Sequence, residues 1–253
     1  MRKELFYNPG ILCERLGIES ARRRRLAKLK GTPAQSLKLG HIDSLELLEM
    51  CRPLGIKTIY DIGANVGTWS LLARAVFPKA SIQAFEPLES CREDFLRNTA
   101  QVDGIRLHEV ALGPADRMAT MHVGAVTDTS SLLPPCDHAK LEGTAVRELP
   151  VRSLDSFVVA NNLPEPDLLK LDVQGYELEV LKGAPMMLQH AQAVLCEVSF
   201  VPLYEGQCLF ADVVTFMSAS GFSLRAFALE TRTGVALEQA DVVFVKMTRN
   251  NIF

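Results

Sequence analysis

The chain has 253 residues, of which 48% are hydrophobic and 23% are charged. This balance is typical of a globular protein and excludes a disordered, collagen-like or membrane-bundle chain. No stretch approaches the roughly 18 uncharged apolar residues of a transmembrane helix, and the basic start lacks the apolar core of a signal peptide. The six cysteines include no CxxC pair, so we expect reduced thiols and a cytoplasmic protein.

The charge is distributed unevenly along the chain, although the net value is only −3. Residues 1–57 carry 12 Lys/Arg against 6 Asp/Glu, and residues 58–253 carry 15 against 24. The acidic body repels a phosphate backbone, so nucleic acid is an unfavourable partner. Two roles stay open for the basic front: closing a homodimer through its helices, or docking on an acidic partner.

Residues 1–57 are predicted to form a helical extension that breaks at Gly31 and resumes near Ser44, with Asp43 or Ser44 as N-cap. From residue 58 onward, short β-rich segments alternate with amphipathic ones, which is the βαβ pattern. Strands are predicted at residues 58–62, 81–85, 106–110, 168–172, 194–198, 223–227 and 242–246. Helices are predicted at residues 68–77, 89–99, 176–189 and 210–220.

The last two predicted strands are separated by a polar segment without a clear helix, so we expect them to pair antiparallel at the sheet edge. Seven strands with this ending describe an α/β, Rossmann-like (class I) methyltransferase sheet better than an ordinary dinucleotide-binding fold. Residues 111–153 interrupt the pattern and are predicted to form an insertion beside the site, with a strand pair near 119–123 and 147–151. The expected division is a 1–57 extension and a 58–253 ligand-binding domain.

A glycine loop follows the first predicted strand and leads into a helix. Its residues Asp61, Gly63, Asn65 and Gly67 place backbone N–H groups and a helix N-terminus beneath a ligand. Asn65 replaces the glycine that lets a pyrophosphate approach in dinucleotide folds. The helix N-terminus suits the carboxylate of a smaller ligand, and Asp61 is available to its ammonium group, directly or through water. Glu86 lies 19 residues after Gly67, where a carboxylate accepts hydrogen bonds from both ribose hydroxyls, so the pattern indicates an S-adenosylmethionine site.

Candidate catalytic residues follow from the rule that ligands of doubly wound sheets lie beyond the carboxyl ends of the strands, which selects Asp172 and Glu197. Lys170 points to the same face as Asp172 and either pairs with an acid or extends from the sheet. Asp172 is the candidate base that accepts the proton of an acceptor hydroxyl. The alternative, in which both acids share Mg²⁺ or Ca²⁺ with the acceptor, lacks a third ligand and is not favoured.

Four further side chains have weaker patterns. Tyr204 and Gln207 follow the fifth predicted strand and are candidates to contact the acceptor. Trp69 is expected to pack in the core. His190 ends a helix that runs back along the sheet, so it is expected at the edge opposite the ligand.

Two segments, VRSLDSF at residues 151–157 and DLLKLDVQGYELEVLKGA at residues 167–184, resemble motifs of the FkbM family of S-adenosylmethionine-dependent methyltransferases. The resemblance covers about residues 58–247, with one departure: the family commonly has an acid where this chain has Gln174. It implies O-methylation of a hydroxyl on a sugar or secondary metabolite. Two alternatives stay open: a nucleotide-dependent oxidoreductase, which Asn65 disfavours, and a non-catalytic cofactor-binding module that docks on an acidic partner.

Overall fold

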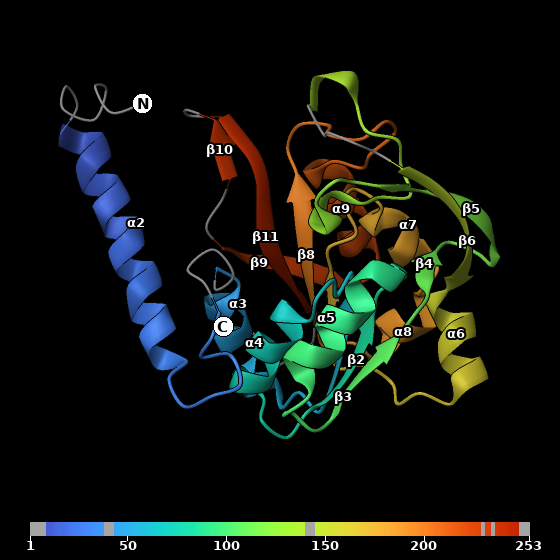
Figure 1. Cartoon of the computed structure of the whole chain (residues 1–253), viewed down its shortest axis with the longest axis horizontal. Helices are drawn as coiled ribbons and strands as arrows, with labels where there is room; N and C mark the ends of the chain where they lie inside the picture. Colours follow the sequence, from blue (N-terminus) through green and yellow to red (C-terminus); the bar gives the residue numbers. More distant parts are fainter. Residues whose placement is uncertain (1–8, 38–42, 140–144, 229–230, 234–235, 248–253) are drawn as a thin grey trace.

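The computed structural model describes residues 9–37, 43–139, 145–228, 231–233 and 236–247. They form two β-sheets surrounded by helices, and a long N-terminal helix extends from this body (Figure 1). No described helix combines the length and apolar character needed to cross a membrane.

The larger sheet contains β1 (Thr58–Ile62), β2 (Ser81–Phe85), β3 (Ile105–His108), β7 (Leu168–Leu171), β8 (Ala193–Ser199), β9 (Phe222–Phe227), β10 (Thr231–Thr233) and β11 (Ala236–Lys246). The smaller sheet contains β4 (Ala111–Gly113), β5 (Arg117–Val123) and β6 (Ala145–Ser153). The α-helices are α2 (Pro9–Lys28), α3 (Leu45–Met50), α4 (Thr68–Val76), α5 (Glu89–Thr99), α6 (Leu154–Asn161), α7 (Glu177–Lys182), α8 (Pro185–His190) and α9 (Phe210–Ala219). The 3₁₀-helices are η2 (Arg52–Leu54), η3 (Thr127–Thr129) and η4 (Asp137–Ala139).

The larger sheet has the strand order β10-β11-β8-β7-β1-β2-β3, with β9 also paired to β11. Its central strands β1 and β7 run parallel and are buried along their whole length, because helices cover both faces. Helices α6 to α9 pack on the face that carries Tyr60 and Ile62, and α3 and α4 pack on the face that carries Ile59. Two polar residues interrupt this apolar centre, since Asp61 and Lys170 are neighbours in the β1–β7 register.

The carboxyl-terminal strands confirm the predicted antiparallel pair, since β9 and β11 pair in that sense. β11 is not the edge, however, because it also pairs antiparallel with β8, which places Asp241 directly beside Glu197. β11 begins at Ala236, earlier than predicted, and the short β10 was not expected. The result is the predicted Rossmann-like methyltransferase sheet with one additional short strand.

Two helical predictions were wrong in detail. The helix expected at residues 176–189 is two helices, α7 and α8, because Pro185 begins the second one at a position where its missing N–H costs nothing. Helix α6 was not predicted. It begins after Ser153, whose hydroxyl accepts a hydrogen bond from the Ser156 amide and so caps the helix.

Ion pairs within the N-terminal extension join α2 to the segment around α3, and Ser44 joins that segment to the body. Arg22 pairs with Asp43 at 2.5 Å, and the largely buried Arg25 pairs with Glu46 at 2.5 Å. Ser44 precedes α3 without capping it. Its hydroxyl instead donates to Asp241 Oδ2 at 2.5 Å, which ties the extension to β11.

We predict that Gly183→Ala lowers the free energy of unfolding by about 1–3 kcal/mol, because a Cβ at this residue would overlap the carbonyl oxygen of Gly113 in β4. Denaturant unfolding measures the change. Gly17→Ala in α2 is the control: a Cβ there meets no neighbouring atom, so stability should be kept or should rise by about 0.5–1 kcal/mol. Unchanged stability of Gly183→Ala would contradict the close packing of α7 on β4.

Candidate active site

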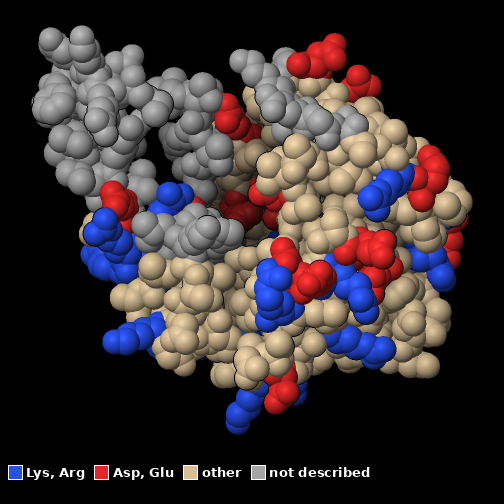
Figure 2. All heavy atoms as spheres, viewed as in Figure 1, with Lys and Arg blue, Asp and Glu red and all other residues tan. Residues whose placement is uncertain are grey.

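A cavity of about 440 Å³ opens at the carboxyl ends of the central strands. Its walls come from the loop after β1, the end of β2, the β4–β6 insertion, the tips of β7 and β8, and the middle of β11. Asp43 and Ser44 complete the wall, so the N-terminal extension contributes to the site, which the expected division at residue 57 did not anticipate. Figure 2 shows acidic side chains inside the recess on this face of the molecule.

The loop after β1 requires glycine at two positions. Gly63 has a φ of +78°, and a Cβ on it would overlap the carbonyl oxygen of Asp172. Gly67, with a φ of +82°, begins α4, and no side chain caps that helix. Because Val66, Thr68 and Trp69 line the cavity, the amino end of α4 faces the enclosed space as the sequence predicts.

Glu86 and Asn65 fix the loop against the end of β2. The buried Glu86 carboxylate accepts hydrogen bonds from the backbone amides of Asn65 and Leu88, each at 2.9 Å. Burial raises the pKa of Glu86, although these two hydrogen bonds oppose the shift. The Asn65 side-chain oxygen accepts a hydrogen bond from Thr127 at 3.2 Å, so it links the loop to the insertion. Both predicted cofactor residues line the cavity.

Asp61 lies beneath the cavity wall instead of on it. Its side chain is fully buried, accepts a hydrogen bond from Ser70 at 2.6 Å and lies 3.4 Å from Lys170 Nζ. Direct contact with a ligand, one of the two expected modes, therefore does not fit its position. Lys170 Nζ also lies 3.3 Å from Asp172 Oδ2 and donates to the Gly63 carbonyl at 3.1 Å.

Lys170 thus pairs with two acids and does not extend from the sheet. Burial alone would lower the pKa of Lys170, but Asp172 and Asp61 hold it above its ordinary value. The ammonium group stays charged and compensates both carboxylates.

Asp172, Glu197 and Asp241 lie on three adjacent strands at the active edge of the sheet. The Gln174 amide donates to Asp172 at 2.8 Å and to Glu197 at 3.3 Å, and Gln239 donates to Glu197 at 3.0 Å. Burial and the neighbouring acids raise the pKa of Glu197 well above its usual range. Burial likewise raises the pKa of Asp241 to about 6. Within the described residues, no group of three or more His, Cys, Asp or Glu side chains has the arrangement of a metal site.

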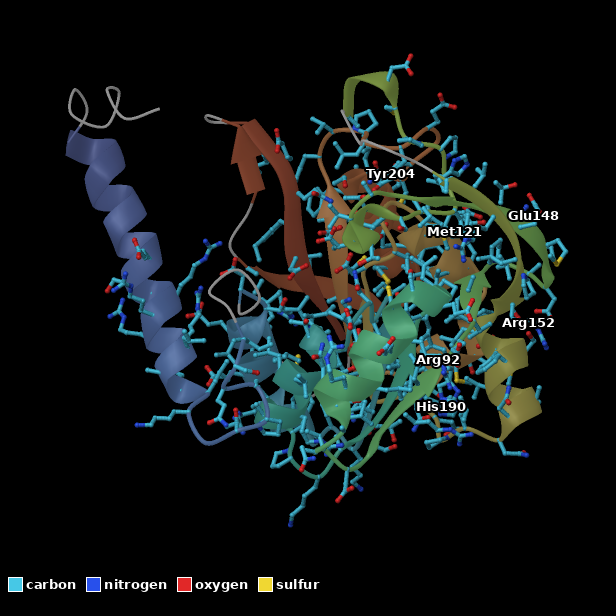
Figure 3. All side chains as sticks on the ribbon, in the orientation of Figure 1. Arg92, Met121, Glu148, Arg152, His190 and Tyr204 are labelled. Atoms are coloured by element: carbon cyan, nitrogen blue, oxygen red, sulfur yellow. The ribbon has the colours of Figure 1, made fainter. Side chains whose placement is uncertain are left out.

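The structure also shows where four other residues considered in the sequence analysis lie relative to the cavity. Tyr204 and Gln207 do not reach the acceptor space: the Tyr204 hydroxyl donates to the Thr129 carbonyl, and the Gln207 amide donates to Ser199. Trp69, expected only in the core, lines the cavity. His190 lies at the lower edge of Figure 3, where it pairs with Glu165 at 3.0 Å, as expected for the edge away from the ligand.

The cavity residues that the sequence analysis did not assign to the site include Asp43, Ser44 and Asp241. The available signal was Asp241, a single acid just before the apolar run VVFV of the last strand. A charge at that position in a predicted buried strand indicates a strand end or a site. Asp43 and Ser44 were interpreted only as a helix cap.

A Rossmann-like sheet with this loop, an acid at the end of β2 and an acidic strand edge defines a class I methyltransferase. The chain belongs to the FkbM methyltransferase family, because the model for the methyltransferase FkbM domain matches residues 61–224.

Curated relatives agree with this membership. The 2-O-methyltransferase NoeI of Sinorhizobium fredii is 30% identical over 203 residues, which cover 74% of this chain and 79% of that protein. Methyltransferase 1 of Beauveria bassiana is 28% identical over 183 residues, covering 66% and 72%. The hexuronic acid methyltransferase AglP of Haloferax volcanii is 26% identical over 140 residues, covering 55% of each chain.

We predict that Glu177 makes stability fall as pH rises. Its buried side chain accepts hydrogen bonds from the Val173 and Gly175 amides, and burial raises its pKa from 4.5 to about 7. The folded state therefore binds a proton that the unfolded state releases between these pH values. Relative to Glu177→Gln, the wild type should lose about 3 kcal/mol of unfolding free energy from pH 4.5 to pH 7.5.

Denaturant unfolding at a series of pH values measures this difference. Glu179→Gln is the control, because that carboxylate is partly exposed on the same helix and pairs with Lys182. Parallel pH profiles for the wild type and Glu177→Gln would show that folding does not raise the pKa of Glu177.

Proposed function

We propose that the protein transfers the methyl group of S-adenosylmethionine to a hydroxyl of a sugar or secondary metabolite. One observation carries the proposal: a single cavity joins Glu86, the uncapped amino end of α4 and the carboxylate of Asp172. The names of two relatives, a 2-O-methyltransferase and a hexuronic acid methyltransferase, support a hydroxyl-bearing sugar as acceptor.

The residues present fit this cofactor. Gly63 and Gly67 let the loop pack closely against Asp172 and Phe95, and the amino end of α4, which faces the cavity, favours a carboxylate. Glu86 offers carboxylate oxygens to a ribose, and the apolar Leu88 and Met121 line the cavity beside it. When bound, S-adenosylmethionine supplies an electrophilic methyl group on a sulfonium.

Asp172 is the base in the proposed reaction. Its Oδ1 accepts a hydrogen bond from Gln174 and its Oδ2 faces Lys170, so both oxygens are fixed in direction. The ammonium of Lys170 stabilises the carboxylate that accepts the acceptor's proton. Glu197, which has a raised pKa, is a donor or positioning group in this arrangement. We propose that these side chains act without a divalent cation.

We further propose that the reaction takes place in the cytoplasm. The cysteines whose side chains the structure describes are free thiols, and thiols stay reduced in that compartment. Cell fractionation with detection of the intact chain tests this location, and recovery in an extracellular or periplasmic fraction would contradict it.

We expect Glu86→Ala to weaken S-adenosylmethionine binding by about 1.5–3 kcal/mol, the range for hydrogen bonds to a charged group. Titration calorimetry measures the affinity, and thermal unfolding checks that the loop amides left without Glu86 do not unfold the protein. Glu89→Ala, an exposed acid in the first turn of α5, is the control and should bind normally. Equal affinities for Glu86→Ala and the wild type would exclude the ribose assignment.

For Asp172→Asn we expect turnover to fall by about 10²–10⁴-fold while S-adenosylmethionine binding persists, because the change keeps the shape but removes the base. The exposed Asp103→Asn is the matched control and should keep full activity. Chelator treatment should leave the wild type active. Loss of activity on chelation with recovery on adding Mg²⁺ would favour a metal instead, and an active Asp172→Asn enzyme would eliminate both versions.

A further inference from the structure

One wall of the cavity lies on the far side of Asp172 from the cofactor loop. Adjacent strands are about 4.8 Å apart, and β11 is three strands from β1, so Asp241 stands about 14 Å from that loop. Glu86 ends β2, on the opposite side of β1. The wall formed by Asp241, Asp43 and Ser44 therefore borders the space left for the acceptor.

Contacts from the N-terminal extension hold this wall in place. The Ser44 hydroxyl donates to Asp241 Oδ2 at 2.5 Å across 197 residues of sequence. Arg22 binds both carboxylate oxygens of Asp43, from Nε at 3.0 Å and from Nη2 at 2.5 Å. Because bidentate arginine pairs fix a carboxylate in direction, α2 positions Asp43 and Ser44 positions Asp241.

The charges that line the cavity are strongly unequal. Among the described lining residues the acids are Asp43, Glu86, Asp128, Asp172, Glu197 and Asp241, and the single cation is Lys170. That cation is already paired with Asp61 and Asp172. Arg22 and Arg25 approach Asp43 but do not line the cavity. Asp43 and Asp172 are already paired with cations, so Asp241 is the acid of this wall that would repel an acceptor carboxylate, whereas neutral hydroxyls can donate to it.

We propose that Asp43, Ser44 and Asp241 form the specificity wall of the acceptor site, which selects an uncharged, hydroxyl-rich glycoside and rejects an anionic one such as a uronide. The inference rests on the proposed function and assigns the substrate class of the same site. Two like charges roughly 5 Å apart near a protein surface repel enough to lower binding by about a hundredfold. This selectivity differs from that named for the relative AglP, which acts on a hexuronic acid.

Because Asp241 titrates, the selectivity of the specificity wall should depend on pH. The titratable groups facing Asp241 are Asp43, Asp172, Glu197 and Lys170, and burial raises its pKa to about 6. Discrimination against the anion should therefore increase between pH 5 and pH 7 as Asp241 ionises. The hydrogen bond from Ser44 lowers this pKa, so Ser44→Ala should move the transition to higher pH.

The experiment compares alkyl glucosides, galactosides and mannosides with the corresponding uronides, using the full chain and S-adenosylmethionine. The ratio of kcat/KM for each neutral and anionic pair should be about 100 at pH 7.5 in the wild type. Asp241→Asn should lower this ratio about tenfold or more, because one repelling charge is gone. Asp103→Asn makes the same chemical change on an exposed turn before β3 and should leave the ratio unchanged.

Adjacent arginines of α2 provide a second matched pair. Arg22→Ala releases Asp43, so the KM for the neutral glycoside should rise severalfold while kcat and S-adenosylmethionine affinity stay unchanged. Arg23 is largely exposed and pairs with Glu19 on its own helix, so Arg23→Ala should change neither constant. A merely structural role of Arg22 would instead lower stability and change both substrates' constants together.

The outcomes separate the inference from the proposed function. Equal use of uronides and neutral glycosides by the wild type, or a ratio independent of pH, would overturn the specificity wall and leave the methyltransferase assignment intact. If the protein binds S-adenosylmethionine but methylates no glycoside, this result would contradict both the proposed sugar acceptor and the specificity wall. The wild-type ratio and its pH dependence decide the question even where a variant does not fold.

Discussion

The buried ammonium group of Lys170 is the interaction on which the rest of the site depends. It lies between Asp61 and Asp172, at 3.4 and 3.3 Å, and donates to the carbonyl of Gly63. A buried carboxylate without a counterion is strongly destabilising, so the fully buried Asp61 depends on this cation, and the partly exposed Asp172 is fixed in direction by it. One side chain therefore joins the core of the sheet, the loop after β1 and Asp172, the proposed base. The left-handed turn at Gly63 brings the loop close enough for this contact.

Protonation and hydrogen bonds from side-chain amides stabilise the neighbouring acids Asp172, Glu197 and Asp241. Burial, with a contribution from the neighbouring carboxylates, raises the pKa values of Glu197 and Asp241, so ionising them together with Asp172 is costly. Gln174 has a φ of +54°, and its amide donates to both Asp172 and Glu197. The family commonly has an acid at this position. In this chain an acid at residue 174 would add a carboxylate beside Asp172 and Glu197. Gln174 instead donates hydrogen bonds to both acids, so it reduces the repulsion between them.

The sequence predicts best what depends on local pattern. The bounds of β1, β2 and α5 agree with the predicted 58–62, 81–85 and 89–99, because apolar runs and glycine turns define them without distant partners. The loop after β1 and Glu86 were correctly predicted to lie together for the same reason, since a fixed spacing connects them. Whether Lys170 pairs with an acid or extends from the sheet could not be decided, because the answer lies in the β1–β7 register.

Residues joined over long distances escaped prediction. Ser44 has the features of an N-cap, yet its hydroxyl binds Asp241 at the other end of the chain. Tyr204 and Gln207 follow an active-edge strand, yet their polar groups are used by neighbouring loops.

The two halves of the cavity have different origins in the chain, and this limits what family membership can predict. The residues proposed to bind the cofactor, from the loop after β1 to Leu88 together with Met121, lie within the matched residues 61–224. Asp172 and Glu197, the proposed catalytic acids, also lie inside that match. Asp43, Ser44 and Asp241 all lie outside it. The acceptor wall is therefore assembled from segments that the family does not define, and relatives that share the transfer reaction are free to differ in the charge of the molecule they methylate.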